Sequence, residues 1–412
     1  MKNMLYKAKG ALALTLAVSI CGAQCVPVFA AEALSAAQQG VQVTPVKELT
    51  EEEKAALQMP KLTAEEALAK AKKHSPDLRE IQDTLDYLDD TLDDIDRSAG
   101  GTVTVPNVEY KKWVNDGWQK VVSAVYQAEQ GKKEEEQFFH GWQARIGEDL
   151  QNLGLEVSVK SYFTSIKSNE DTLSLTKKNA EIQKKLYEQG KEKNRLGLLS
   201  KYNLNQLEIA AKQAQDNVAL LEASMEQLYI KLNDLMGEKA DARFEYVYDV
   251  TYTPYKLSLP MEQYLNAALK KDLTIQLKEL ALDSAKFTKN YVGESNTRLD
   301  SNTQEYNYDT AKRNLKTAKT DKEMAIRNAY LQLQQMETQI TSAQSSLTKA
   351  QADYRAAQIN LRAGNVTKTA VEQAEMGVVS AQNSLNQLIY NYDMLVFTFE
   401  NPSLLGNTAQ AQ

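Results

Sequence analysis

Two segments of the chain carry the same spacing of apolar residues, 167 positions apart. Intervals of three and four residues alternate without interruption, so the average period is about 3.5 residues and every side chain falls on one stripe of a helix. Such a stripe is buried only against another helix, so the spacing predicts paired long helices in two copies. The first series is Leu204, Leu207, Ala211, Ala214, Val218, Leu221, Met225, Leu228 and Leu232. The second is Val371, Ala374, Val378, Ala381, Leu385, Leu388, Tyr392, Leu395 and Phe399.

A partner helix is expected upstream of each series. All eight prolines lie outside residues 107–253 and 261–401, which leaves both blocks free for uninterrupted helices. In the first block we expect a long helix from about residue 153 to 189, with polar Asn169, Thr176 and Gln183 in the stripe and hence a wetter interior. Each long helix should have roughly 40 residues and a length of about 60 Å. In the second block the partner stripe is Ile326, Ala329, Leu333, Met336, Ile340, Ala343, Leu347, Ala350, Tyr354, Ala357 and Leu361.

The turns between the paired helices align residue for residue. Arg195-Leu196-Gly197-Leu198-Leu199-Ser200-Lys201 matches Arg362-Ala363-Gly364-Asn365-Val366-Thr367-Lys368. Glycine supplies the positive φ that ends one helix, and Ser or Thr caps the next. Either turn alone indicates only a well-formed helical hairpin, but two at matched positions indicate a common architecture. The fold class is therefore all-α: two tandem repeats of long antiparallel coiled-coil hairpins, with little or no β-strand.

The chain divides into six segments. Lys2, Lys7 and Lys9, an apolar run and a small-residue site ending at Ala30 predict an export signal. The second repeat opens 197 residues after the first, so the first repeat holds 30 extra residues, which we place within 98–150. The predicted segments are a signal peptide (1–30), a flexible leader (31–60), the first repeat (61–240), an extended connector (241–258), the second repeat (259–406) and a tail (407–412).

Composition argues against several functions. The formal net charge is −7, or −10 without the three signal lysines, which disfavours a nucleic-acid partner. Both cysteines, Cys21 and Cys25, lie in the signal, so the mature chain has no thiol chemistry. We find no nucleophile–base pattern, phosphate loop or metal-ligand spacing, and we expect neither an enzyme nor a cofactor. The acidic residues from Asp89 to Asp96 are expected to form a solvated helix face rather than a calcium site, and His74 a helix end rather than a ligand.

Residues 102–150 are the least regular part of the sequence. Thr102–Val105 has the composition of a short strand or extended turn. We favour packing for the aromatic residues of this region, although they could also bind a cell-wall glycan or a lipid surface. They are Trp113, Trp118, Tyr126, Phe138, Phe139 and Trp142.

This organisation resembles the TolC family of efflux ducts over nearly the whole mature chain. The likeness rests on the opening helix at residues 62–68, the paired Arg-x-Gly-x-x-Ser/Thr turns, the stripes that follow them, and the Leu-Met-Gly and Leu-Leu-Gly endings at 235–237 and 404–406. The resemblance implies a homotrimer with a twelve-helix barrel and hairpin tips that meet the adaptor of a tripartite pump. It implies that the tips comprise Arg195, Leu196, Gly197, Leu199, Ser200, Arg362, Gly364, Val366 and Thr367. The coiled-coil seams would include Leu207, Leu221, Leu228, Leu333, Ile340, Leu385 and Leu388.

Two departures from the family pattern stand out. Residues 293–304 are polar and 102–105 are short, so neither offers the two amphipathic strands per repeat of members that cross an outer membrane, and membrane association is doubtful. Ala370 and Gln373 stand where the best-known member has gate aspartates; Glu372 or Glu375 is the candidate replacement.

Two functions are consistent with these features. The first is an exported duct component for efflux or secretion, placed in the cell envelope, at the outer membrane or at the periplasm or cell surface. The second is an extracytoplasmic coiled-coil spacer that does not conduct. The substrate and the class of pump do not follow from the sequence.

Overall fold

The computed structural model describes residues 59–99, 131–292 and 298–406. The predicted signal peptide, nearly all of the leader, the tail, residues 102–105, Trp113, Trp118 and Tyr126 lie outside the described residues.

The described chain consists almost entirely of helices, in the order that the hairpin prediction requires. The first half contains β1 (Lys61–Thr63), α2 (Ala64–His74), α3 (Pro76–Ala99), α6 (Gly131–Arg195) and α7 (Lys201–Met236). The second half contains β2 (Glu245–Val247), α8 (Met261–Lys271), α9 (Leu273–Val292), α10 (Arg298–Arg362), α11 (Lys368–Glu400) and the 3₁₀ helix η2 (Pro402–Leu404). The all-α fold class is confirmed.

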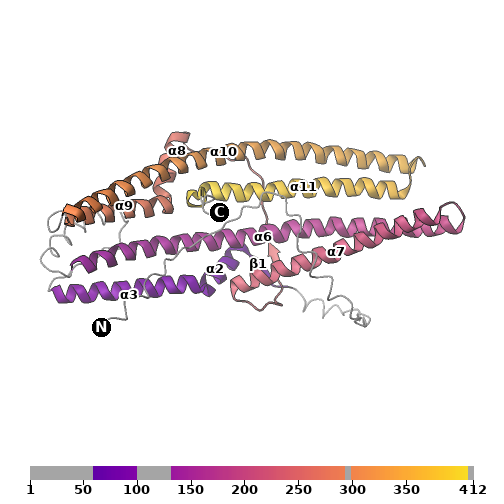
Figure 1. Cartoon of the computed structure of the whole chain (residues 1–412). Helices are drawn as coiled ribbons and strands as arrows, with labels where there is room; N and C mark the ends of the chain where they lie inside the picture. The colour runs from indigo at the N-terminus through magenta and orange to yellow at the C-terminus, as the bar shows by residue number, and fades with distance from the viewer. Residues whose placement is uncertain (1–58, 100–130, 293–297, 407–412) are drawn as a thin grey trace.

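The long helices lie side by side in an elongated layer (Figure 1). Helices α6 and α10 each run along most of its length. Near the tips, contacts connect α7 to α6, α6 to α11 and α11 to α10; toward the opposite end they connect α3 to α6, α6 to α9 and α9 to α10. The layer is therefore four helices wide at either end. The two inner helices are α6 and α11 near the tips, and α6 and α9 toward the opposite end. The two edges of the layer are α10 on one side and α3 followed by α7 on the other.

The two long helices exceed the predicted length. Both α6 and α10 have 65 residues, equivalent to about 97 Å, where the stripes indicated roughly 40. Much of the region expected to be irregular is helical from Gly131 onward. The prediction failed here because α6 packs against both α3 and α9, so its apolar residues occupy two faces and do not repeat on one stripe. The adjacent residues Phe138 and Phe139 are both buried and pack with Leu280 of α9.

This packing explains part of the aromatic group. Trp142 also lies against the buried cluster of Phe138, Phe139, Ile146 and Leu280, so the packing interpretation is confirmed for the aromatic residues that are described. Helix α6 begins 55 residues after α3 begins, whereas α10 begins 25 residues after α9 begins. The structure thus places the 30 extra residues of the first half in this region.

Each hairpin holds together through an apolar seam. Leu333, Ile340 and Leu385 are buried in the second hairpin, and Leu388 is half-buried beside them. Leu207, Leu221 and Leu228 of the first hairpin are half-buried. Of the predicted stripe on α10, Leu361 is the exception: it is exposed because it lies in the last turn, beyond the packed part of the hairpin.

The ends of the short helices follow from local chemistry. Thr63 and Glu66 form a capping box at the start of α2, in which each side chain accepts a hydrogen bond from the backbone N–H of the other. Helix α2 ends at His74, the predicted helix end, and α3 begins at Pro76, since proline is tolerated in the first turn of a helix but not in its interior.

The connector is extended but carries only three strand residues. Its strand β2 pairs in parallel with β1, with Tyr246 opposite Leu62. Tyrosines of the connector then pack on both hairpins in turn. Tyr246 stacks on Tyr229 and meets the edge of Phe163, while Tyr252 lies against Tyr392 and Tyr255 against Phe399. The connector therefore ties the two hairpins together at mid-length (Figure 1).

Tyr246 allows a test of this packing. Its side chain is 3% exposed, and its hydroxyl has no hydrogen-bond partner among the described residues. A buried hydroxyl without a partner costs about 1–3 kcal/mol. We expect Tyr246→Phe to raise the free energy of unfolding by about 1 kcal/mol at neutral pH, measured by urea unfolding monitored by circular dichroism. The control is Tyr306→Phe, whose ring is 65% exposed.

The same residue predicts a pH dependence. Burial, with a smaller contribution from Tyr229, raises the pKa of Tyr246 to about 12. An unfolded tyrosine ionises near pH 10, so the stability contributed by the neutral folded side chain is complete below about pH 10 and is lost as the pH rises toward 12. Tyr246→Phe should weaken this alkaline loss of stability. A destabilised Tyr246→Phe protein at neutral pH would mean that the hydroxyl has a partner.

Candidate docking tips and the interface between the hairpins

Both hairpins end in the same backbone motif. Gly197 and Gly364 have φ values of 74° and 75°, the left-handed region that favours glycine. In the first turn, Leu198 N donates to Lys193 O (2.8 Å) and Gly197 N donates to Asn194 O (2.9 Å). The equivalent bonds of the second turn run from Asn365 to Asn360 and from Gly364 to Leu361. These are the paired bonds of a Schellman motif, which satisfies the last carbonyls of a helix.

The predicted caps start the return helices. Ser200 Oγ accepts a bond from Asn203 N (3.1 Å), and Thr367 Oγ1 accepts one from Ala370 N (3.2 Å). The first turn has one additional bond, from Asn194 Nδ2 to Leu199 O (2.7 Å). Both turns are thus fixed by their own hydrogen bonds, which makes them rigid ends for the hairpins.

The two turns lie at the same end of the molecule (Figure 1). Of the predicted tip residues, Arg195, Leu196, Gly197, Ser200, Arg362, Gly364 and Thr367 are exposed. Leu199 and Val366 are half-buried. Leu199 turns back toward Gly190, where an added Cβ would lie 2.5 Å from Leu207 Cδ1 and 3.5 Å from Leu199 Cδ2. Glycine at this position lets the two leucines close the end of the first hairpin.

The arginines of the two turns differ in their surroundings. Arg195 Nη2 lies 2.5 Å from Glu192 Oε1 on the same helix. This hydrogen-bonded pair raises the pKa of the Arg195 guanidinium and lowers that of the Glu192 carboxyl. For Arg362, no carboxylate within the described residues lies at ion-pair distance.

A row of polar contacts joins the two hairpins along α6 and α11, and we call it the polar ladder. Lys160 Nζ lies 2.9 Å from Asp393 Oδ2, and Asn383 and Asn386 donate to Asp171. Nearer the tips the ladder consists of Lys178–Glu375 (2.5 Å), Lys185–Glu372 (2.9 Å) and Gln189–Thr369 (3.3 Å).

The two candidate gate residues, Glu372 and Glu375, lie in the polar ladder. Glu372 and Glu375 both pair with lysines of α6 in the same chain, and the hydrogen bond to Glu372 raises the pKa of Lys185. Each hairpin is held internally by an apolar seam, whereas charges and amides make the contacts of the polar ladder between α6 and α11. Partly exposed pairs of this kind contribute about 0–1 kcal/mol each.

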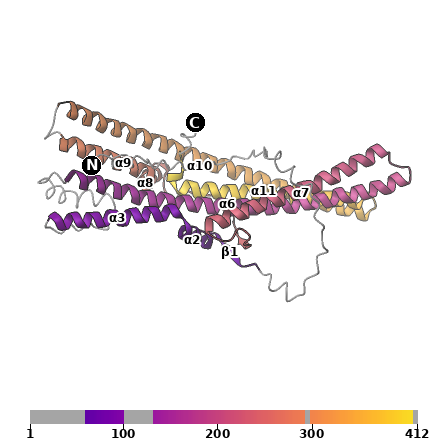
Figure 2. The same ribbon diagram turned by 60° about the horizontal axis from the view of Figure 1, so that its bottom comes forward.

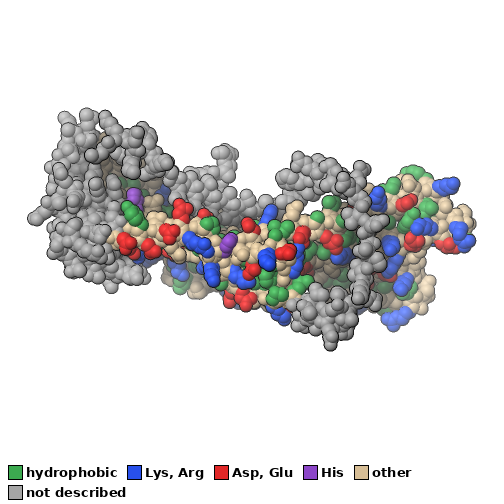
Figure 3. Space-filling model, turned by 90° about the horizontal axis from the view of Figure 1, so that it is seen from below, with side chains coloured by type: hydrophobic (Ala, Val, Ile, Leu, Met, Phe, Trp, Pro, Cys, Tyr) green, Lys and Arg blue, Asp and Glu red, His purple; other side chains and the backbone are tan. Residues whose placement is uncertain are grey.

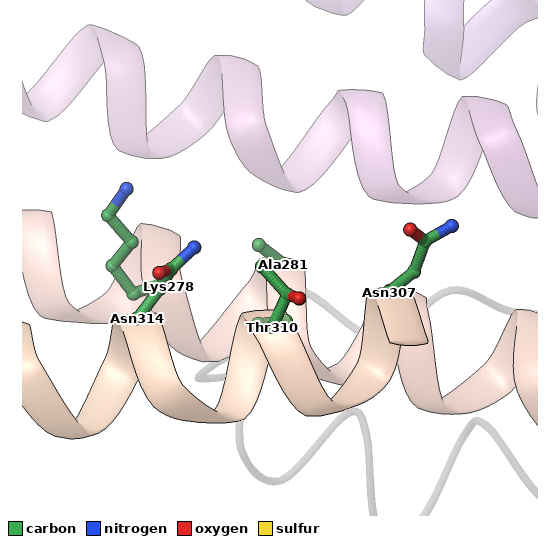
Figure 4. A pocket seen from close by; sticks show the side chains of 6 residues that line it. Lys278, Ala281, Asn307, Thr310 and Asn314 are labelled. Carbon is green, nitrogen blue, oxygen red and sulfur yellow. The ribbon is translucent and has the colours of Figure 1, made fainter. Parts of the chain in front are cut away.

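A hollow lies between α9 and α10, away from the tips (Figure 4). Its volume is about 210 Å³, and Lys278, Asn307, Thr310 and Asn314 point into the same space. Amides, a hydroxyl and one ammonium provide no nucleophile activated by a base.

Among the described residues, no group of three or more His, Cys, Asp or Glu side chains could hold a metal ion. In that part of the chain, no helix is long and apolar enough to cross a membrane.

Several solved structures are similar to this fold. The outer membrane protein VceC from Vibrio cholerae matches with a TM-score of 0.57 and 14% identity, over 83% of this chain and 96% of that chain. The Campylobacter jejuni CmeC outer membrane channel matches with a TM-score of 0.59 and 13% identity, over 84% and 86%. The open state of the Neisseria gonorrhoeae MtrE outer membrane channel matches with a TM-score of 0.56 and 11% identity, over 83% and 89%.

These matches establish the class of fold. Identities of 11–14% carry no more than the fold, and this chain shares the all-α fold of long helical hairpins with these TolC-like channels. No family model matches the sequence, and no curated protein matches it. The similar structures are channel proteins and not enzymes, which agrees with the sequence-based expectation of a non-enzyme.

Proposed function

We propose that this chain is an exported subunit of a TolC-like duct for efflux or secretion in the cell envelope. In this proposal three copies form a helical barrel, and the hairpin tips dock the adaptor of a pump. The supporting observation is the layer itself: four helices lie side by side with both turns at one end, and within the described residues no further helix packs beyond either edge. Channels of this fold provide the analogy for function.

The two edges carry the surface that such an assembly requires. Leu220 on α7 is 62% exposed and Leu331 on α10 is 61% exposed. Ile209 and Ile230 are further exposed side chains on α7, and Met324 and Ile359 on α10. In the proposed barrel, α7 of one copy packs against α10 of the next, so three layers of four helices close a ring of twelve.

We expect the mature chain to have the mass of a trimer in light-scattering or native mass measurements. Leu220→Asp and Leu331→Asp should lower that mass while the circular dichroism stays helical, because each places a charge in the apolar contact between copies. The control is Ser174→Asp, an exposed position on the interior helix α6. A wild-type monomer would contradict the proposal.

Docking of an adaptor is tested separately. The proposed contact residues are Arg195, Leu196, Gly197, Leu199, Ser200, Arg362, Gly364, Val366 and Thr367. Cysteines introduced at positions 195 and 362 should crosslink to an adaptor exported by the same cell, whereas a cysteine at exposed Tyr306, on the half of α10 away from the tips, should not. Conductance in planar bilayers separates a duct from the alternative of a non-conducting spacer, because stable channels are expected only from the duct.

A further inference from the structure

The two tips differ in the side chains that they expose. In the first turn Leu196, Leu198 and Tyr202 are 57%, 74% and 71% exposed. The corresponding residues of the second turn are Ala363, Asn365 and Thr369. Single exposed apolar residues are common on protein surfaces, but three within seven residues at a rigid helical turn form a patch, and such patches mark interaction sites. We call Leu196, Leu198 and Tyr202 the apolar knob.

The knob is presented in a fixed conformation. Leu196 and Leu198 flank Gly197, and the backbone N–H groups of all three residues are bonded to the last turn of α6. A partner that binds the knob therefore has little backbone freedom to remove, which favours affinity. The first tip also extends beyond the second in both ribbon views (Figures 1 and 2), so a partner approaching this end along the long axis meets the knob first.

The charge around the knob is positive although the chain as a whole is negative. Between Gly190 and Leu204 there are four basic residues and one acidic residue, in a chain with a net charge of −7. Among the described residues, neither Lys193 nor Lys201 has a carboxylate at ion-pair distance. Lys and Arg side chains are prominent at this end of the molecule, with a few acidic ones among them (Figure 3). A complementary surface is acidic.

We propose that the apolar knob of the first tip inserts into an apolar recess rimmed by Asp and Glu side chains on the adaptor, and that the second tip contributes little to the affinity. This rests on the proposed function, since it names the chemistry of the partner that docks there. An apolar and cationic tip also fits an anionic lipid surface. Membrane-binding segments, however, have clusters of about 4–8 basic residues, and here Lys191 and Arg195 are paired with Glu188 and Glu192, which leaves two free lysines.

The test compares matched substitutions in the two tips. Leu196→Ser/Leu198→Ser removes most of the knob, and Ala363→Ser/Asn365→Ser changes the same positions of the second turn. Two further double variants reverse the charge of the tips: Lys193→Glu/Lys201→Glu in the first tip and Arg362→Glu/Lys368→Glu in the second. All eight residues are exposed, so circular dichroism and oligomer mass should stay unchanged. Each variant is titrated with the purified soluble part of each adaptor that the source cell exports.

We expect either first-tip variant to weaken adaptor binding by about tenfold or more, and either second-tip variant by about twofold or less. Wild-type binding should also weaken as salt rises from about 50 to about 200 mM. Equal losses from the two tips, or no loss from the first, would overturn the inference while adaptor docking remained established. If the trimer forms but wild type binds no adaptor, the proposed docking itself fails.

A flotation assay covers the lipid alternative, with vesicles that contain about 30% phosphatidylserine. We expect the wild-type chain not to float with them. Flotation that is lost in Leu196→Ser/Leu198→Ser, together with unchanged adaptor binding, would assign the knob to a membrane surface and overturn the proposal.

Discussion

Replacement of Lys322 by methionine is expected to lower the free energy of unfolding by about 3–5 kcal/mol. Lys322 and Asp272 are buried, with 6% and 0% of their side chains exposed, and Lys322 Nζ lies 2.9 Å from Asp272 Oδ2. The same ammonium donates to Pro402 O (3.0 Å) and Leu405 O (2.5 Å). Lys322→Met leaves a carboxylate and two carbonyls buried without this donor, and an unpaired buried charge is the costly element.

The first half of the chain provides the control. Ser75 stands between α2 and α3 where Asp272 stands between α8 and α9, and each caps the helix that follows it. Leu155 is the twenty-fifth residue of α6, and Lys322 is the twenty-fifth residue of α10. The first half thus has a neutral hydroxyl and an apolar side chain where the second has an ion pair.

We therefore expect Asp272→Ser/Lys322→Leu to recover most of the stability lost in Lys322→Met. Replacing both members of a buried pair by residues without charge is often neutral. Denaturant unfolding of the wild type, Asp272→Ser, Lys322→Leu and the double variant gives the coupling energy of the pair. A loss below about 1 kcal/mol in Lys322→Met would mean that water reaches the pair.

The second large effect is expected at Leu333 in the seam between α10 and α11. Its side chain is 1% exposed and belongs to the apolar core with Ile340, Leu385 and Phe399. Leu333→Ala should cost about 2–5 kcal/mol through the lost contacts and the cavity. Leu333→Asp should cost more, because the cavity is then occupied by an unpaired carboxylate.

Leu331 makes this experiment specific, because it lies two residues away on the same helix and is 61% exposed. Leu331→Asp should change the unfolding free energy of the single chain by less than about 0.5 kcal/mol and act on the oligomer instead. Thermal and denaturant unfolding followed by circular dichroism compares the two variants. Similar losses of unfolding free energy in Leu331→Asp and Leu333→Asp would show that the apolar stripe does not separate a buried face of α10 from an exposed one.

The parts of the fold that could be predicted rest on local sequence. The seams follow from an unbroken 3.5-residue spacing, and the turns follow from Gly197, Gly364, Ser200 and Thr367, whose roles depend on their immediate neighbours. The length of α6 could not be read in this way. Near Phe138 that helix contacts two other helices, so its apolar residues no longer form one stripe.

Interactions between distant segments were mostly beyond sequence reasoning. Lys178 and Glu375 meet in the polar ladder, and only knowledge of which hairpin faces which could pair them. Lys322 offered a clearer signal. It precedes Ile326 by four residues and is therefore in phase with the apolar stripe, a position where a lysine requires a buried partner. The sequence also contains the three apolar residues of the knob, Leu196, Leu198 and Tyr202, but it does not show that their side chains are exposed.

The uninterrupted course of α6 and α10 has a mechanical consequence. Helices α6 and α10 are each one continuous helix of 65 residues, so each acts as a strut between the turn at its C-terminal end and the opposite end of the molecule. The shorter helices are interrupted partway along, at Ser75 and at Asp272 between consecutive helices. A force applied at the turns is therefore conveyed along the two struts, and flexure is accommodated where the short helices meet.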